Sequence, residues 1–446
     1  MQIFLFLFPG ILLVFSRNFN RKPLSELLTY IVGLSLSFFV VLPWFIKYLH
    51  VPLTIFAYLV FICTLLLLFY GRKMIDLKGI KLDRGEIVIA GIFLLIVLLR
   101  CLPMFFQIAP AGGEMSMHSY IARLICDNDG IPSSYEPILP ISRLGFSSSG
   151  FPILSALISM LGDLPVYRSS LLMACLSHAF ICFGFYIFLL KFFGRNTSAA
   201  ISIAATFLTR DPQWMVRWGG NSEVLALFFF TVAVSLVIGS KKDISWPEAA
   251  LASMALAAAL ITYSNVLHIG GAALWSSIDA KSVMFDLIAG IPFIASLVFV
   301  ATSAEKIFAP RNKYLLIVLI TIGSIYYGGF YLFNSASMCS VTRSDMDAFR
   351  WMSAVLNKRA VVVNNYGDAG IWIPSVVGMT ITNPYIDLAY KEELDANLLK
   401  LKPDYIYIGS KAVYPVEIKS QDLEKNPGRY RRVYSNGAAQ VWKILK

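Results

Sequence analysis

Two side chains in a polar stretch of a largely apolar sequence have the types and spacing for acid–base chemistry. Glu114 and His118 stand in the segment GGEMSMHSYIARLICDNDGIP, which directly follows an apolar run. Residues four positions apart share one face of a helix, so the imidazole could orient the carboxylate. A carboxylate held in this way can take a proton from a hydroxyl group or ligate a divalent cation such as Mg²⁺ or Mn²⁺. An acid at the start of a helix also favours the helix dipole, so a capping role for Glu114 stays open.

The composition places this segment in a membrane protein. The 446 residues are 57% hydrophobic and 15% charged, whereas a soluble domain has about a quarter charged residues. Uncharged runs at 28–46, 51–70 and 169–190 approach the length of about 20 residues that crosses a bilayer as a helix. The net charge of +11 does not indicate nucleic-acid binding, because much of the Lys and Arg lies in short loops between spans. The six cysteines have no metal-binding spacing.

The basic loops predict how the chain is oriented. Segments 17–22 and 71–85 are rich in Lys and Arg and are therefore expected in the cytoplasm. The span at 87–104 then runs outward, so Glu114 lies outside. The apolar run 151–161, flanked by Gly and Pro, is too short to span and predicts a helix lying at the outer surface.

The same rule predicts about ten spans and two extracytoplasmic termini in the plasma (inner) membrane. Whether 265–279 crosses the membrane stays open. We expect N-terminal transmembrane helices at 1–86 and a transmembrane module at 87–340, with its outside loop at 103–165.

The last part of the chain, 341–446, has a different composition. The runs RAVVVNN, MTITNP and PDYIYIGS predict strands, and DMDAFRWMSAVL has helical spacing. The segment YRRVYSNGAAQVWKIL predicts a hairpin that turns at Asn436 and Gly437. The predicted fold class is therefore mainly α, a polytopic membrane protein with a small C-terminal extracytoplasmic α/β domain. The glycine motifs of nucleotide-binding sites do not occur in the sequence.

Three passages together resemble the GT-C superfamily of polytopic membrane glycosyltransferases, in the branch of protein mannosyltransferases and lipid-sugar-dependent transferases. They are GGEMSMHSYIARLICDNDGIP, GFPILSALISMLGDLPVYRSSLL and NNYGDAGIWIPSVVGMTITNP, in this order. The resemblance extends from about residue 88 to the C-terminus. It implies that the module at 87–340 is catalytic and that the N-terminal helices at 1–86 are additional to it. Two departures are visible: the family often has paired acids where this chain has Glu114 alone, and its Pro-Pro pair is reduced to Phe151-Pro152.

The resemblance implies transfer of a sugar from a polyprenyl-phosphate-linked donor to a glycan, lipid or protein acceptor at the outer face of the membrane. Such a transfer needs a base, for which Glu114 is the candidate, and positive charge where the phosphate departs. Arg217, beside Trp218 and a Gly-Gly pair, is the first choice for that charge, and snorkelling to lipid headgroups is the alternative. The other candidates are Arg210, Arg143 and Arg168 for the donor phosphate, and Trp218, Asn221, His268, Tyr366, Asp368 and Trp372 for substrate contact.

Two other functions fit the same pattern. A GT-C-like subunit that binds glycolipid without catalysis is compatible with a lone Glu114. A transporter or flippase of lipid-linked glycans is the second alternative, although the sequence has no inverted repeat and no matching pair of broken helices.

Overall fold

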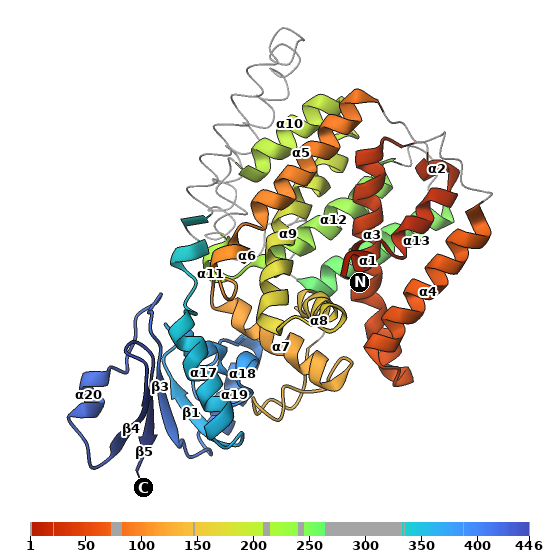
Figure 1. Cartoon of the computed structure of the whole chain (residues 1–446). Helices are drawn as coiled ribbons and strands as arrows, with labels where there is room; N and C mark the ends of the chain where they lie inside the picture. Colours follow the sequence, from red (N-terminus) through yellow and green to blue (C-terminus); the bar gives the residue numbers. More distant parts are fainter. Residues whose placement is uncertain are drawn as a thin grey trace, which may run out of the picture.

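The computed structural model describes most of the chain and shows a helical bundle with a small sheet domain at one end (Figure 1). The described residues are 2–20, 22–72, 83–145, 148–207, 215–239, 245–263, 332–333, 335–386 and 388–445. The predictions for 265–279, Arg210 and His268 lie outside these residues.

The bundle contains helices of very different lengths. In chain order its elements are α1 (Gln2–Leu7), η1 (Gly10–Phe15), α2 (Arg17–Asn20), α3 (Leu24–Ile46), η2 (Lys47–Leu49), α4 (Leu53–Gly71), α5 (Arg84–Arg100), α6 (Pro103–Phe106), α7 (Glu114–Asn128), α8 (Gly150–Gly162), α9 (Val166–Leu189), α10 (Arg195–Phe207), α11 (Met215–Trp218), α12 (Asn221–Gly239) and α13 (Trp246–Thr262).

Five helical stretches of the described chain are long and apolar enough to cross a membrane, so the chain is a multi-pass membrane protein. They are Leu24–Leu49, Leu53–Gly71, Arg84–Phe106, Val166–Leu189 and Asn221–Gly239. The predicted total of about ten is not reached in the described residues. One reason is that the apolar segment near the N-terminus is broken into α1 and η1, with Pro9 between them. Another is that α10 and α13 have only 13 and 17 residues.

Burial separates the central helices from the peripheral ones. The apolar window of α9 is 83% buried, whereas those of α4 and α5 are 33% and 28% buried. Helix α9 packs against α5, α8, α10 and α12. The exposed Leu, Ile and Phe side chains of α4 and α5 are therefore the surface that faces lipid.

The helix predicted at 151–161 forms as α8, and other helices of the bundle surround it. Every residue of α8 from Gly150 to Ser159 is buried, because α3, α7 and α9 pack around it. It is therefore an internal helix of the bundle. With 13 residues it is too short to span a bilayer, and its place at the outer face of the membrane stays a prediction.

The C-terminal domain has the mixed helix and strand content that the sequence predicts. Its elements are α17 (Arg343–Val355), β1 (Val361–Asn364), η6 (Ala369–Trp372), α18 (Ile373–Val376), β2 (Thr380–Ile381), α19 (Leu388–Leu398), β3 (Tyr405–Ile408), α20 (Ser420–Glu424), β4 (Tyr430–Ser435) and β5 (Gln440–Ile444).

The five strands form one sheet in the order β2-β1-β3-β5-β4. Strand β1 pairs in parallel with β2 and β3, whereas β5 is antiparallel to both β3 and β4. The predicted terminal hairpin is confirmed: β4 and β5 pair, and Gly437 has φ +88° in the turn between them. This domain lies beside α7 (Figure 1), so its loops can reach the residues of the predicted site.

Candidate functional site

Helix α7 begins at Glu114, and its first turn holds the carboxylate in a fixed position. His118 Nε2 lies 3.0 Å from Glu114 Oε1 and 3.1 Å from the hydroxyl oxygen of Ser222 on α12. The Ser222 hydroxyl also lies 3.4 Å from Glu114 Oε1. In the described residues, all hydrogen bonds of this carboxylate go to Oε1. The side chain is thus held through one oxygen, which leaves Oε2 for another partner.

The surroundings of His118 assign its role. The imidazole is fully buried, and its ring centroid lies 5.6 Å from that of Phe151 on α8. Its Nδ1 atom has no hydrogen-bond partner among the described atoms. Nε2 faces the carboxylate and can donate a hydrogen bond to it. His118 is therefore in position to orient the acid.

Two glycines bring the backbone of α11 against the start of α7. A Cβ atom on Gly112 would lie 2.2 Å from the backbone nitrogen of Gly219. A Cβ atom on Gly219 would lie 2.9 Å from the backbone nitrogen of Met115 and 3.1 Å from Glu114 Cβ. Both glycines also have positive φ, +88° and +102°, a conformation that other residues rarely adopt. Glycine at these positions is what allows the two segments to touch.

Three tyrosines of the C-terminal domain cover this region. The ring centroids of Tyr366 and Tyr385 are 6.0 Å apart, as are those of Tyr366 and Tyr414. A Cβ atom on Gly113 would lie 3.0 Å from Tyr385 Cδ2 and 3.3 Å from the Tyr366 hydroxyl oxygen, so both rings lie against the start of α7. Burial, followed by the charges of Tyr414 and Glu114, raises the pKa of Tyr366 to about 12. Burial and Glu114 also raise the pKa of Tyr385, so both phenols are neutral donors at physiological pH.

The predicted outside loop after α7 docks the domain in this position. Thr380 donates to the carbonyl of Ile138 at 2.7 Å, and Asn397 donates to that of Pro140 at 2.9 Å. The rings of Tyr135 and Tyr390 lie 5.5 Å apart. In each of these contacts the two residues are far apart in the sequence. Tyr366, Tyr385 and Tyr414 therefore lie near Glu114 only because the C-terminal domain docks on this loop.

Arg217 and Trp218 lie close to the same place. Arg217 accepts a hydrogen bond through its backbone carbonyl from the Tyr414 hydroxyl, at 3.2 Å. Its guanidinium group lowers the pKa of Tyr414, although burial has the larger effect and the pKa is raised on balance. A cation therefore lies near Tyr414, and the predicted role of Arg217 toward a phosphate stays a prediction. Trp218 directly precedes Gly219, at the contact with Gly112.

Other predicted residues are engaged elsewhere. Arg168 donates to the carbonyls of Gln107 and Met104 at 2.6 and 2.7 Å, so it holds the turn around α6. Asn221 Oδ1 lies 3.0 Å from Nε2 of His178 inside the bundle. Arg143 is exposed on the loop that contacts α19. The proposed site therefore does not include Arg168, Asn221 or Arg143.

Asp368 and Trp372 belong to the core of the C-terminal domain. The carboxylate of Asp368 accepts from the backbone N–H groups of Gly370 and Gly409, at 2.7 and 2.8 Å. Burial raises its pKa to about 6, and these bonds oppose the rise. Trp372 is only 1% exposed. Both side chains shape the loop after β1, and neither offers surface to a substrate.

The sequence reading missed Ser222, Tyr385 and Tyr414. No local motif marks them, because each meets Glu114 or its neighbours across more than a hundred positions of the chain.

The described residues contain no group of three His, Cys, Asp or Glu side chains that could hold a metal ion. At the proposed site, the described side chains that could ligate a metal are Glu114, which has one unengaged oxygen, and His118, whose Nε2 atom is already bonded to the carboxylate. These two side chains do not provide enough ligands for a divalent cation, so the proposed reaction does not use one.

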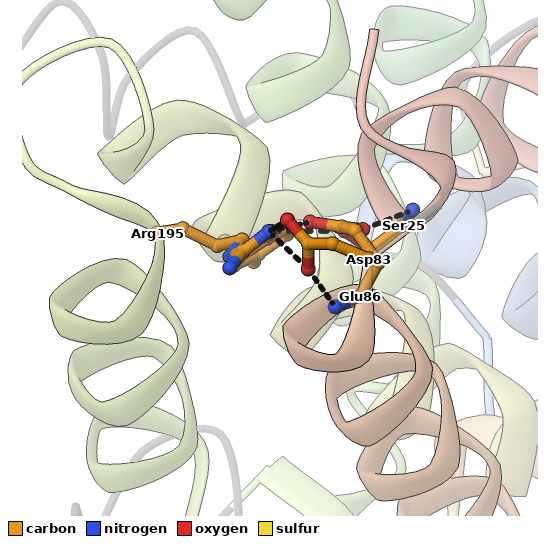
Figure 2. A network of polar contacts seen from close by, with 5 residues as sticks. Ser25, Asp83, Glu86 and Arg195 are labelled. Atoms are coloured by element: carbon orange, nitrogen blue, oxygen red, sulfur yellow. Dashed lines mark hydrogen bonds and ion pairs between the residues drawn. The ribbon is translucent and has the colours of Figure 1, made fainter. Parts of the chain in front are cut away.

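A second buried cluster lies away from this site and joins α3, α5 and the start of α10 (Figure 2). Glu86 accepts from the backbone N–H and the hydroxyl group of Ser25, at 3.0 and 2.7 Å, and from Arg195 at 3.1 Å. Arg195 also donates to Asp83 at 2.7 Å. The Ser25 hydroxyl lies 2.9 Å from that of Tyr186 on α9. Both oxygens of Glu86 are thus engaged.

No protein-family model and no curated protein matches the chain. Among solved structures, the chain is similar to the crystal structure of the Archaeoglobus fulgidus oligosaccharyltransferase in complex with zinc and sulfate, with a TM-score of 0.31 and 11% sequence identity. The similarity covers 79% of this chain and 73% of that chain. A likeness this weak does not decide the activity, which has to be argued from the site.

Proposed function

We propose that this protein is a GT-C type glycosyltransferase that moves a sugar from a polyprenyl-phosphate-linked donor to an acceptor hydroxyl group. The observation that carries the proposal is the state of Glu114. This carboxylate is 6% exposed, is fixed through Oε1 by His118 and Ser222, and has Oε2 without a hydrogen-bond partner in the described residues. A buried, oriented carboxylate with one unengaged oxygen is suited to accept a proton.

The reaction would proceed by direct displacement. Glu114 Oε2 takes the proton of the acceptor hydroxyl group as its oxygen forms a bond to the anomeric carbon of the donor. The bond from that carbon to the phosphate oxygen breaks, and the polyprenyl phosphate leaves with the electron pair. Arg217 lies near Tyr414, and its charge would stabilise the departing phosphate.

The orientation belongs to the same proposal. The basic segment 17–22 would face the cytoplasm, and Glu114 and the C-terminal domain would face outside. This sidedness agrees with a donor whose sugar phosphate is presented at the outer surface. The acceptor class, whether glycan, lipid or protein, is not fixed by the carboxylate alone.

The decisive experiment replaces Glu114 by Gln, which keeps the size of the side chain and removes its basicity. Transfer from a radiolabelled polyprenyl-phosphate sugar should fall by roughly 10²–10⁴-fold, the usual effect of losing general base help, with normal insertion and melting temperature. Glu136→Gln is the matched control, because Glu136 is an exposed acid of the same loop region, and its transfer rate should be unchanged.

Two results would count against this function. Near-normal transfer by Glu114→Gln would remove Glu114 as the base. Binding of the lipid-linked sugar without transfer by the wild-type chain would favour the non-catalytic glycolipid-binding subunit, for which the same carboxylate would serve as a hydrogen-bond acceptor.

A further inference from the structure

The order of the strands in the C-terminal sheet reverses at β1, and open sheets commonly bind ligands at such a reversal. Strand β1 lies between β2 and β3 and is parallel to both. The chain leaves β1 for β2 on one side and then returns past β1 to β3 on the other. Ligands of open sheets bind outside the carboxyl ends of the strands at such a reversal. The carboxyl ends of β1 and β3 are therefore the place to look for a second part of the site.

Each of the three parallel strands is followed by one of the tyrosines that lie near Glu114. Tyr366 follows β1, Tyr385 follows β2 and Tyr414 follows β3. The Tyr414 hydroxyl is used on the carbonyl of Arg217. In the described part of the chain, no hydrogen bond from the hydroxyl groups of Tyr366 and Tyr385 is formed, and both residues are partly exposed. Neither hydroxyl is a buried polar atom, so both can reach a ligand that enters between the rings and α7.

Asp368 and Asn365, two other polar side chains at these strand ends, already form hydrogen bonds within the domain. This limits the kinds of ligand that the site can bind. Asp368 is held by Gly370 and Gly409. Asn365 Oδ1 accepts from the backbone N–H groups of Glu417 and Ile418, at 3.1 and 2.9 Å. What remains toward α7 is two neutral phenol groups, aromatic faces and the unengaged oxygen of Glu114.

This set complements a neutral molecule that has several hydroxyl groups and an apolar face. A sugar ring has both, because its hydroxyl groups exchange hydrogen bonds with phenols and its C–H face packs on aromatic rings. Glu114 disfavours an acidic group at Oε2 itself, and the nearby Arg217 is assigned to the donor phosphate. A peptide backbone carries no hydroxyl group.

We propose that Tyr366 and Tyr385 hold the acceptor as a neutral sugar ring, so that one of its hydroxyl groups lies on Glu114 Oε2. This inference rests on the proposed transferase function and names its acceptor as a glycan. The two tyrosines are specificity residues, whereas Glu114 performs the chemistry.

The test uses the full-length chain in nanodiscs and the variants Tyr366→Phe and Tyr385→Phe, which remove one hydroxyl group each and keep the ring. Binding of a panel of methyl pyranosides is measured by saturation-transfer NMR, and transfer is measured with lipid-linked donor and the best-bound glycoside. We expect a fivefold to tenfold increase in KM for the glycoside in each variant, about the value of one hydrogen bond, with little change in kcat or in KM for the donor. Tyr430→Phe on β4 is the matched control and should behave as the wild-type chain.

The outcomes separate the two proposals. Methyl pyranosides bound by the wild-type chain and weakened by both substitutions support the sugar site even where no transfer is detected, in which case the transferase function fails alone. Unchanged binding of the glycosides in both variants overturns the sugar site, whether or not transfer occurs. Transfer to a hydroxyl-bearing peptide but to none of the pyranosides overturns it as well.

Discussion

Two buried glutamates, Glu114 and Glu86, serve opposite purposes in this molecule. Glu86 at the start of α5 is fully buried and accepts hydrogen bonds through both oxygens, from Ser25 and Arg195 (Figure 2). Glu114 at the start of α7 is nearly as buried, but its described bonds go to Oε1. A satisfied buried carboxylate fixes helices in place, whereas a half-satisfied one retains the capacity to bind or react. The number of engaged oxygens is therefore the observed difference between Glu86 and Glu114, the proposed base.

The largest difference between the two glutamates, apart from catalysis itself, is expected in stability. Glu86→Gln places an amide N–H₂ group against the donors of Ser25 or Arg195, and it leaves a buried N–H group without an acceptor. We expect a loss of roughly 2–4 kcal/mol in the free energy of unfolding, measured by thermal melting in detergent. Glu114→Gln should lose much less stability. Equal melting temperatures for both variants would contradict the distinction.

A smaller effect is expected at the second contact of Glu114. Ser222→Ala removes one of the two groups that hold Oε1 and leaves His118 in place. Transfer should fall about tenfold, which corresponds to about 1.4 kcal/mol in the activation free energy, because the carboxylate is less well oriented. The melting temperature and the binding of the donor should change little. A fall in donor binding with unchanged kcat would show that Ser222 touches the donor instead of positioning the acid.

The smallest effect is expected at the exposed edge of the Glu86 cluster. The hydrogen bond from Arg195 lowers the pKa of Asp83 below its ordinary value of 3.8. An acid with a lowered folded-state pKa contributes stability above its ordinary pKa and loses it as the pH falls through the folded value. Asp83→Asn keeps the cap on α5 and should shift the melting temperature far less than Glu86→Gln. The shift should shrink further in high salt and disappear in acid, and an equal shift at all pH values would contradict an ionic contribution.

The parts of the fold and site that follow from local pattern could be predicted from the sequence. The uncharged runs predicted α3, α4 and α9, and the i, i+4 spacing predicted the contact between Glu114 and His118. The hairpin of β4 and β5 followed from its Asn-Gly turn. In each case the deciding interaction lies within one element or between neighbours in the sequence.

The parts that depend on packing could not be predicted. Ser222 meets His118 across 104 positions, and Tyr385 reaches α7 only because the C-terminal domain docks on the preceding loop. The burial of α8 depends on three surrounding helices. Asp368 had the sequence context of a binding loop, but one of the two backbone N–H groups that occupy its carboxylate belongs to Gly409, 41 positions away.

The contact between Gly112 and Gly219 has a genetic consequence. An added methyl group at Gly112 would collide with the backbone of Trp218 and Gly219, and one at Gly219 would lie 2.9 Å from the backbone nitrogen of Met115 and 3.1 Å from Glu114 Cβ. Position 112 is already glycine, so no smaller residue there can make room for a larger one at 219. A suppressor screen starting from Gly219→Ala should therefore return true revertants, or changes that shift the backbone, but no compensating substitution at position 112.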